Sequence, residues 1–381
     1  MFVKRSVLSL LETRLDDRKA LLILGPRQTG KSTILKEIAQ RANKKILFLN
    51  CDEARSRESL ESIKSLSQLG NLIGQAEMVM VDEAQRVRDI GIILKLITDN
   101  FPTVKLVVSG SSAFELSNVI NEPLTGRKWE FLLLPFSSEE MVHQTSYFEE
   151  SGHLHRRMIY GMYPDVVNNP GSEQAILNEL STSYLYKDIF TFQDVRKPEV
   201  LPKLLKALAV QIGSEVTFNN LAQVLETDTA TVQRYVDLLE KTFIVFRLTS
   251  FSRNVRNELR RSRKIFFYDN GIRNALLSAF QPLSARTDVG PLWENFMVSE
   301  RIKRNRHHKL FRNEYFWRTT QQQEIDYLEE YDGGLFAYEF KWSTTKPARA
   351  SKTFLNAYPE ATFQTIHPNN YLDEFLNTPN L

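Results

Sequence analysis

Short apolar runs alternate with helical patterns along the first third of the chain. The runs lie within residues 21–24, 45–50, 77–83 and 104–108. Uninterrupted apolar runs of this length are typical of strands buried on both faces of a parallel sheet. Residues 33–39, between the first two runs, and residues 2–18 instead carry apolar side chains at helical spacing. The pattern predicts an α/β domain with a parallel sheet over residues 1–140.

The middle of the chain shows two helical patterns separated by a turn. Residues 217–225 form the first, and residues 228–239 form the second, with Asp228 placed to cap it. Apolar runs within residues 243–248 and 264–268 follow as candidate strands. A short helix, a turn, a longer helix and two strands predict a winged helix-turn-helix behind a helical lid.

The last third changes back to a mixed pattern after the turn-rich residues 282–291. Residues 291–300 read as a helix, and residues 316–318, 324–328 and 337–341 as successive strands. We therefore expect three domains: an α/β domain over 1–150, a helical and winged-helix domain over 151–285, and a second α/β domain over 286–381.

Composition narrows the class of protein. The 381 residues are too many for one core, while 42% hydrophobic and 25% charged residues fit a globular chain. The single cysteine, Cys51, excludes an intrachain disulfide and a cysteine-based zinc site. No apolar run has the length of a membrane span, and the amino terminus leads into an amphipathic pattern unlike a signal peptide. We expect a cytoplasmic protein without membrane contact.

The segment after the first apolar run has the pattern G-x-x-x-x-G-K-S. Its residues are Gly25, Pro26, Arg27, Gln28, Thr29, Gly30, Lys31 and Ser32, followed by Thr33. A glycine-rich loop between a strand and a helix directs backbone N–H groups and the helix N-terminus at phosphate groups. Lys31 adds a full positive charge, and the Ser32 hydroxyl can ligate Mg²⁺. The segment predicts a site for ATP and Mg²⁺.

Two carboxylates end the third apolar run. A buried parallel strand would deliver Asp82 and Glu83 to the same sheet edge as the phosphate loop. There Asp82 can hold the Mg²⁺ shell, and Glu83 can polarise the water that attacks the γ-phosphate. The serines at 109–112 follow the fourth run; they fit either a γ-phosphate sensor or an ordinary turn.

Arg127 is the candidate for a cation inserted into a neighbouring subunit's nucleotide site. Phosphoryl transfer benefits from an added positive charge, and Arg127 follows the Leu124-Thr125-Gly126 turn. An arginine that is only solvated is the alternative.

These segments together resemble a known family. The sequences GPRQTGKST, VDEAQR, VVSGSS and LTGRKWEFLLLPFS are similar to those of prokaryotic AAA-superfamily ATPases of the AAA-14 and DUF4143 pair. The resemblance implies an ATPase core, a winged-helix segment and a C-terminal domain of the PD-(D/E)xK, restriction-endonuclease-like type. It places Glu83 at the family's Walker glutamate and Arg127 in its Gly-Arg pair. It also implies a homo-oligomer, such as a ring.

Two clusters of basic residues suggest nucleic acid as a partner. Between the predicted wing strands lie Arg253, Arg256, Arg260, Arg261, Arg263 and Lys264, which would attract the phosphate backbone of DNA. A winged helix that packs only against protein is the alternative. A second run fits either a nucleic-acid track or a solvated helix face: Arg301, Lys303, Arg304, Arg306, Lys309 and Arg312.

Asp326 followed by Glu339-x-Lys341 reproduces the arrangement of metal-dependent nucleases. Alternate residues of a strand share a face, so Glu339 and Lys341 would both point toward Asp326 on the paired strand. The carboxylates of Asp326, Glu339 and the helical Glu294 could hold Mg²⁺, and Lys341 could activate water. A satisfied charge cluster at a sheet edge is the alternative.

The sequence thus predicts an AAA-type ATPase that acts on DNA. Turnover would move the winged-helix and nuclease-like domains, and the C-terminal domain would either cleave DNA with a metal or only bind. A non-cleaving, ATP-gated switch or remodelling ATPase is the competing hypothesis.

Overall fold

The computed structural model describes residues 3–111, 124–184, 197–252, 263–319, 321–343 and 351–376. The chain divides into two compact units. One comprises Lys4–Leu134 with Lys241–Phe243, and the other comprises Met1–Val3, Pro135–Glu240 and Ile244–Leu381. The predicted boundary at 150 thus lies inside the second unit, and so does the predicted boundary at 285.

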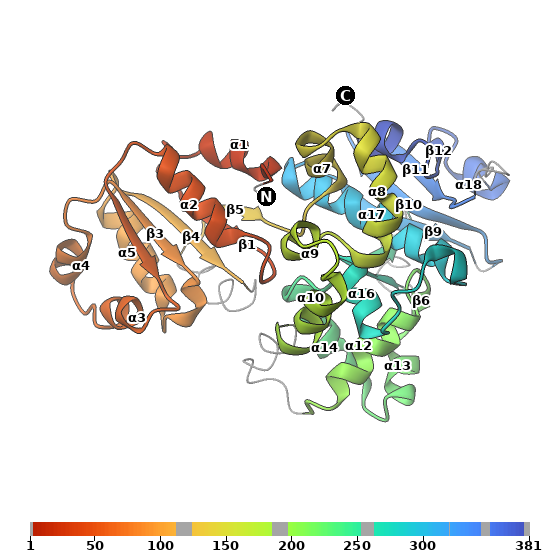
Figure 1. Cartoon of the computed structure of the whole chain (residues 1–381), viewed down its shortest axis with the longest axis horizontal. Coiled ribbons are helices and arrows are strands. Elements are labelled where there is room, and N and C mark those ends of the chain that lie inside the picture. Colours follow the sequence, from red (N-terminus) through yellow and green to blue (C-terminus); the bar gives the residue numbers. More distant parts are fainter. Residues whose placement is uncertain are drawn as a thin grey trace. The chain divides into compact units, whose positions relative to one another are not determined.

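The first unit is built on a five-stranded sheet in the order β2-β3-β4-β1-β5, and every pairing in it is parallel (Figure 1). This confirms the predicted parallel sheet. Its strands are β1 (Ala20–Leu24), β2 (Ile46–Asn50), β3 (Met78–Asp82), β4 (Lys105–Gly110) and β5 (Lys128–Leu132). Strands β1, β3 and β4 are buried along their whole length, which is why their sequences carry no polar alternation.

Helices flank this sheet. They are α1 (Ser6–Glu12), α2 (Lys31–Arg41), α3 (Ala54–Glu61), α4 (Leu66–Ile73) and α5 (Ile90–Asn100), with a 3₁₀ turn at Ala84–Arg86. Apolar residues of α1 and α2 share one core with β1, including Leu8, Leu11, Leu35 and Ile38. The helix predicted over 2–18 is shorter than expected, because α1 ends at Glu12 and turns follow.

The second unit contains a mixed seven-stranded sheet in the order β12-β11-β10-β9-β7-β8-β6. Its strands are β6 (Glu215–Val216), β7 (Val245–Ser250), β8 (Arg263–Phe267), β9 (Asn313–Arg318), β10 (Glu324–Tyr331), β11 (Gly334–Phe340) and β12 (Thr362–Ile366). Parallel pairing of β7 with β9 at Thr249↔Tyr315 and Ser250↔Phe316 joins strands from the predicted second and third domains.

The second unit also contains helices, which are labelled in Figure 1. They are α7 (Ser138–Gln144), α8 (Tyr147–Tyr160), α9 (Pro164–Asn168), α10 (Glu173–Glu179), α12 (Val200–Val210), α13 (Phe218–Val224), α14 (Thr229–Lys241), α16 (Asn270–Leu276), α17 (Val289–His307) and α18 (Lys352–Ala357). Short π-helices at Leu180–Tyr184 and Tyr371–Leu376 and a 3₁₀ helix at Leu283–Ala285 complete the described elements.

The predicted helix, turn and helix over 217–239 correspond to α13 and α14. Thr217 caps α13 by accepting from Asn220 N at 3.3 Å, and Asp228 accepts from Thr231 N at 2.7 Å as predicted. The strands that follow, β7 and β8, pair antiparallel. The winged-helix interpretation itself stays a prediction.

One core spans the predicted boundary at 285. A single hydrophobic cluster contains residues from both sides of it, such as Phe246 and Phe266 before it and Trp293 and Phe296 of α17 after it. Across the boundary, the Asn295 amide accepts from Phe267 N at 2.8 Å and donates to the Phe267 carbonyl at 3.0 Å. Residues on both sides of 285 therefore pack as one body.

No helix in the described part of the chain is both long and apolar enough to cross a bilayer.

Candidate nucleotide site and carboxylate cluster

The predicted phosphate loop connects β1 to α2 and has a backbone that requires glycine at its first position. A Cβ built on Gly25 would lie 2.1 Å from the Leu133 carbonyl oxygen, so any side chain there would collide with backbone. Gly30, at φ 94°, lies in the left-handed region and precedes the first residue of α2. The loop therefore curls tightly onto the helix N-terminus, where backbone N–H groups attract anions.

Lys31 is the first residue of α2 and is buried. Its Nζ donates to the carbonyl oxygens of Gly25 at 2.9 Å and Pro26 at 2.8 Å. The ammonium group is thus folded over the loop that would hold the phosphates. Within the same loop the buried Thr29 hydroxyl donates to Pro26 O at 2.9 Å.

The other predicted loop residues range from exposed to buried. Pro26 is buried, Arg27 and Ser32 are half-buried, and Gln28 and Thr33 are exposed. The Ser32 hydroxyl belongs to the first turn of α2, where the motif requires it.

Asp82 and Glu83 lie where predicted, at the carboxyl end of β3. All strands of this sheet are parallel, so the carboxyl ends of β1, β3 and β4 meet at one edge. Ser109 of β4 donates its hydroxyl to Asp82 Oδ1 and accepts from Glu83 N at 3.2 Å. Glu83 has a positive φ of 53°, which turns the chain sharply after the strand. The neighbouring β4 thereby fixes the acid pair at the phosphate-loop edge.

Sequence reasoning missed Gln85. Its Nε2 donates to Glu83 Oε2 at 2.6 Å and to Ser111 Oγ at 2.8 Å. The Glu83 carboxylate is thus oriented by an amide that also contacts the serine segment after β4.

Arg5 was also missed. This buried residue lies just before α1; its Nη1 donates to Thr29 O at 2.7 Å and its Nη2 to Leu134 O at 2.6 Å. One guanidinium group therefore connects the phosphate loop to the last residue before the chain enters the second unit. Nothing in the local sequence marks Arg5, because both partners are backbone atoms far along the chain.

Arg127 lies at the opposite edge of the sheet from the phosphate loop. Its carbonyl accepts from Ala20 N at 2.8 Å, at the amino end of β1, whereas the loop follows the carboxyl end. Its Nε lies 2.6 Å from Asp99 Oδ1, and the side chain is 40% exposed. Arg127 therefore cannot serve the nucleotide site of its own chain, and its predicted role in a neighbouring subunit stays a prediction.

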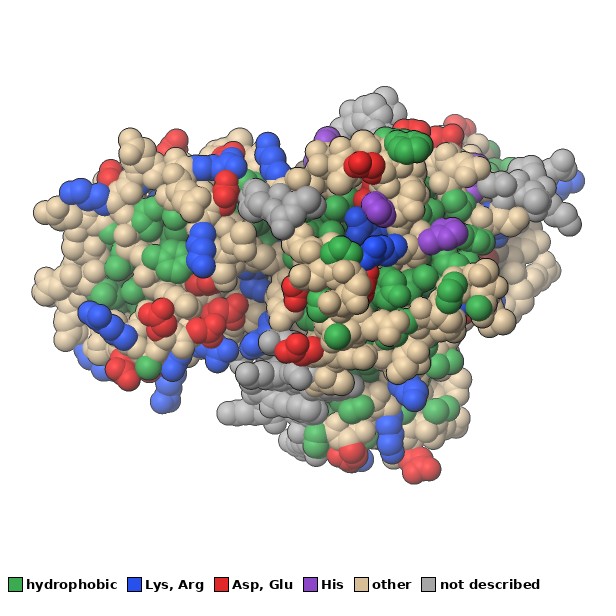
Figure 2. All heavy atoms as spheres, viewed as in Figure 1, with side chains coloured by type: hydrophobic (Ala, Val, Ile, Leu, Met, Phe, Trp, Pro, Cys, Tyr) green, Lys and Arg blue, Asp and Glu red, His purple; other side chains and the backbone are tan. Residues whose placement is uncertain are grey.

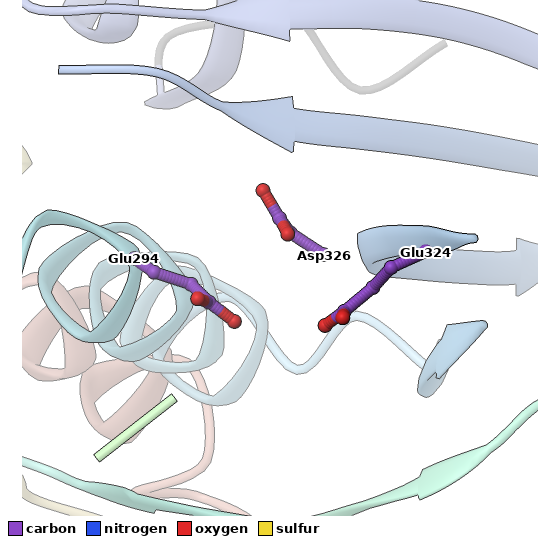
Figure 3. Close-up of side chains that lie close together, drawn as sticks. All are labelled: Glu294, Glu324 and Asp326. Carbon is purple, nitrogen blue, oxygen red and sulfur yellow. The ribbon is translucent and has the colours of Figure 1, made fainter. Parts of the chain in front are cut away.

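Three carboxylates gather in the second unit. Oxygen atoms of Glu294 on α17 and of Glu324 and Asp326 on β10 lie within 4.8 Å of one another. Figure 3 shows the carboxylates of Glu294 and Glu324 facing one another, with Asp326 beside them. Glu324 was not predicted, although its spacing of two residues from Asp326 places both side chains on the same face of β10.

Glu339 lies outside this group of three. Lys341 Nζ donates to Glu339 Oε1 at 2.6 Å, and Asp326 Oδ2 accepts from Phe340 N at 2.8 Å. The predicted approach of Asp326 to the strand that carries Glu339 and Lys341 is confirmed. The predicted trio of Glu294, Asp326 and Glu339 is replaced by a trio that contains Glu324.

Lys264 lies in the carboxylate cluster and not in a DNA-binding surface. The side chain is 1% exposed, and its Nζ lies 2.7 Å from Glu294 Oε1 and contacts Glu324 Oε1 as well. The prediction that Lys264 contacts DNA is therefore wrong. Lys264 is the second residue of β8, whose residues 264–267 are all buried, and burial with two carboxylates leaves no path to a phosphate backbone.

Burial and mutual repulsion shift the acids of this region. Burial raises the pKa of Glu294 to about 8, with Lys264 opposing the shift. Burial, with the negative charge of Asp326, raises the pKa of Glu339 to about 7. Burial disfavours the charge on Lys264, but Glu294, Asp326 and Glu324 together raise its pKa above the ordinary value. The acids attract a cation, and Lys264 already supplies one.

The second basic run belongs to buried and paired positions of α17 and the turn behind it. Arg301, Lys303 and Arg304 are buried. Arg301 donates from Nε and Nη2 to the two Glu329 oxygens at 2.9 Å each, and Lys303 Nζ donates to Glu300 Oε1 at 2.7 Å. Both expectations for these residues, a nucleic-acid track and a solvated face, are wrong.

The outer members of this run are also engaged. Arg306 Nη2 lies 2.6 Å from Glu314 Oε2, and Arg312 Nη1 lies 2.6 Å from Glu329 Oε2. Lys309, half-buried, follows the helix. Acids on β9 and β10 therefore form ion pairs with these arginines, although the sequence shows them as a run of positive charge.

Most of the first basic cluster cannot be placed. Arg253, Arg256, Arg260 and Arg261 lie outside the described residues. Arg263, half-buried at the start of β8, places its guanidinium carbon 4.3 Å from the ring centroid of Phe218. On the faces shown in Figure 2, Lys and Arg side chains lie interspersed with Asp and Glu in each unit.

Three families match consecutive parts of the chain. Residues 17–142 match a family described as an AAA domain, AAA_14. Residues 151–283 and 289–372 match two domains of unknown function, DUF8612 and DUF4143.

Two relatives and one solved structure are similar to large parts of the chain. An uncharacterized protein of Mycobacterium tuberculosis is 24% identical over 372 residues, which cover 96% of this chain and 80% of the relative. An uncharacterized protein of Haemophilus influenzae is 26% identical over 271 residues, 66% of this chain and 68% of the relative. The structure of a Walker-type ATPase of Pyrococcus abyssi superimposes with a TM-score of 0.51 at 16% identity, covering 72% of this chain and 96% of that one.

Proposed function

Because the chain belongs to the P-loop ATPases of the AAA type that combine an AAA_14 domain with a DUF4143 domain, we propose that it is a Mg²⁺-dependent ATPase acting on DNA. Its turnover would move the second unit relative to the first. The proposal depends on one observation: three residues lie at the same edge of the sheet. Lys31 is there as the first residue of α2, Asp82 as the last residue of β3, and Glu83 as the residue that follows β3.

Each residue of this edge has a distinct task. Lys31 exchanges its bonds to the Gly25 and Pro26 carbonyls for bonds to phosphate oxygens. The Ser32 hydroxyl and the buried Asp82 carboxylate suit Mg²⁺, which prefers oxygen ligands and usually keeps several waters. Bound Mg²⁺ would offset the charge of the β- and γ-phosphates. Glu83, oriented by Gln85, would polarise the attacking water.

Arg127 fits a role in a homo-oligomer. It is partly exposed and lies away from its own phosphate loop, so it would have to act on the nucleotide of a neighbouring copy. A ring would supply such a cation to every site.

For the second unit we carry two candidate roles. Metal-dependent DNA cleavage is supported by Asp326 beside the strand that carries Glu339 and Lys341. A non-cleaving, ATP-gated switch that binds DNA or protein is supported by Lys264, which already forms ion pairs with Glu294 and Glu324. The position of Lys264 favours the switch.

ATP binding and turnover in two pairs of variants test the ATPase. We expect Lys31→Ala to lose ATP binding, while Lys36→Ala on the exposed face of the same helix keeps it. We expect Glu83→Gln to bind ATP and to turn over roughly 100-fold more slowly, while the exposed Glu58→Gln behaves as the parent. Parental ATP affinity in Lys31→Ala would contradict the proposal.

The same turnover assay tests the DNA partner. Single-stranded, duplex and branched DNA are each added across a salt series. Contact through arginines such as Arg263 predicts that DNA raises ATP turnover at low salt and that the stimulation falls steeply as salt rises. An ATPase rate that no DNA changes at low salt would remove DNA from the proposal and leave the ATPase intact.

A further inference from the structure

Lys264 is held in the middle of the three carboxylates by the sheet itself. Strand β8 pairs with β7 at Leu248↔Lys264 on one side and with β6 at Glu215↔Lys264 on the other. The backbone of Lys264 is thus fixed by two neighbouring strands. Its ammonium nitrogen also lies 5.5 Å from the ring centroid of Phe316 on β9. A side chain packed this closely cannot swing away without disturbing the core.

The ammonium group contacts the oxygens that a metal ion would need. Its nitrogen lies 2.7 Å from Glu294 Oε1 and also contacts Glu324 Oε1, and both acids belong to the group of three with Asp326. Mg²⁺ needs oxygens at about 2.0–2.1 Å. An ion at that distance from the same two atoms, Glu294 Oε1 and Glu324 Oε1, would compete with Lys264 Nζ for the space between them, so the two cations exclude one another there.

Charge leads to the same conclusion. Without Lys264 the cluster would hold three acids within 4.8 Å, and their mutual repulsion would favour either protonation or the binding of another cation. Arg318 Nη1 lies 3.5 Å from Glu324 Oε2 and reduces the remaining charge further. The second lysine, Lys341, is occupied with Glu339 and does not lie between Glu294 and Glu324.

We infer that Lys264 is a tethered cation that fills the divalent-metal position of the Glu294, Glu324 and Asp326 cluster, so that this cluster binds no Mg²⁺ or Mn²⁺ in the folded chain. The inference deepens the non-cleaving form of the proposed function. It does not depend on ATP hydrolysis.

Mn²⁺ titration of the full chain, freed of metal and nucleotide, tests the inference. Binding is followed by calorimetry and by the electron paramagnetic resonance signal of free Mn²⁺. Each protein is compared with its Asp326→Asn counterpart, so that Mn²⁺ held at the nucleotide site cancels. We expect no Asp326-dependent binding in the wild type. In Lys264→Met we expect one additional Mn²⁺ per chain, bound at least tenfold more tightly than any Asp326-dependent Mn²⁺ in the wild type. This additional Mn²⁺ should be lost in Lys264→Met/Asp326→Asn.

Lys341→Met is the matched control. It removes a lysine from the same region without vacating the space between Glu294 and Glu324, so we expect no new Mn²⁺ site. An equal gain in Lys341→Met would overturn the inference in favour of a general charge effect.

Two further outcomes would overturn it: Asp326-dependent Mn²⁺ binding by the wild type, or a folded Lys264→Met that gains no site. Circular dichroism shows whether Lys264→Met is folded. If it is not, the wild type and Asp326→Asn alone decide, because equal Mn²⁺ binding by the two supports the inference and unequal binding contradicts it. Failure of the ATPase proposal would appear separately, as absence of ATP turnover by the wild type.

Discussion

Two buried lysines in this protein, Lys31 and Lys264, have opposite surroundings. Lys31 is 4% exposed and donates to the carbonyl oxygens of Gly25 and Pro26, in the loop that precedes it. Lys264 is 1% exposed and contacts the carboxylates of Glu294 and Glu324, which come from distant elements. Phosphate oxygens can readily replace carbonyl dipoles as partners of an ammonium group, whereas replacing two carboxylates would leave two half-buried acids without their cation.

The comparison shows that the groups hydrogen-bonded to a buried lysine determine whether it can bind a ligand or only stabilises the fold. Lys31 follows a phosphate-loop motif and lies beside a helix N-terminus that attracts anions. Lys264 is the last residue of a run of arginines that predicts DNA binding from the sequence alone. In the structure its side chain is instead buried and pairs with a cluster of acids. Proximity in sequence to other cations did not determine its role.

The largest expected effect separates the two lysines by stability. Lys264→Met leaves the half-buried Glu294 and Glu324 without their cation, so we expect the free energy of unfolding to fall by about 3–4 kcal/mol, toward the lower end of the cost of breaking a buried ion pair. Lys31→Met leaves two neutral carbonyl oxygens without a donor and no charge unpaired, so we expect a smaller loss of about 1 kcal/mol. Urea unfolding of both variants at pH 7 measures the difference. Equal losses would break the comparison.

A second effect extends the comparison to Glu329, an acid that is also neutralised inside the second unit. Hydrogen bonds and charge from Arg301 outweigh burial and lower the pKa of Glu329 from 4.5 to about 2. The folded state therefore favours the ionised form. This contribution is fully present above pH 4.5, is lost as the pH falls from 4.5 toward 2, and amounts to about 3 kcal/mol.

Glu329→Gln isolates that contribution. We expect the variant to be less stable than the wild type by about 3 kcal/mol at pH 7, with the gap narrowing steadily below pH 4.5. Urea unfolding at a series of pH values measures it, because the other acids titrate in both proteins and cancel. A gap that stays constant down to pH 3 would show that Glu329 is not held ionised.

The smallest expected effect concerns the support of Lys31. Arg5→Lys retains the charge but cannot bridge the Thr29 and Leu134 carbonyls at once, so the phosphate loop loses one of its ties. We expect the Kd for ATP to rise about tenfold, which is about 1.4 kcal/mol. Equilibrium titration with ATP measures it, and the exposed neighbour Lys4→Ala serves as control. An unchanged Kd would restrict Arg5 to a structural role.

The sequence predicted the first unit well because its signals are local. The phosphate loop is one contiguous motif, and the buried strands of the parallel sheet reveal themselves as short apolar runs. Parallel pairing then places the ends of β1, β3 and β4 at one edge without further information. Arg5 escaped this reasoning, because a side chain that bonds only backbone carbonyls leaves no pattern.

The second unit was predicted less well because its charges are balanced over long distances. Glu324 could have been found from its spacing to Asp326, but the contact of Lys264 with Glu294 depends on how β8 packs against α17. In the same way, Arg301 meets Glu329 of β10, so a run that reads as basic in the sequence is neutral in space. Counting charges along a segment cannot reveal such pairing.

The pairing of β7 with β9 matters to anyone who wishes to express the DUF4143 segment alone. Cutting the chain near residue 286 would remove β7, the partner strand of β9, and leave β9 as an exposed edge strand. Exposed edge strands promote aggregation. The same cut would remove Lys264 from Glu294 and Glu324. We expect such a fragment to bind divalent ions at a cluster that is closed to them in the intact protein. A metal-dependent nuclease activity measured on the fragment would then be an artefact of truncation.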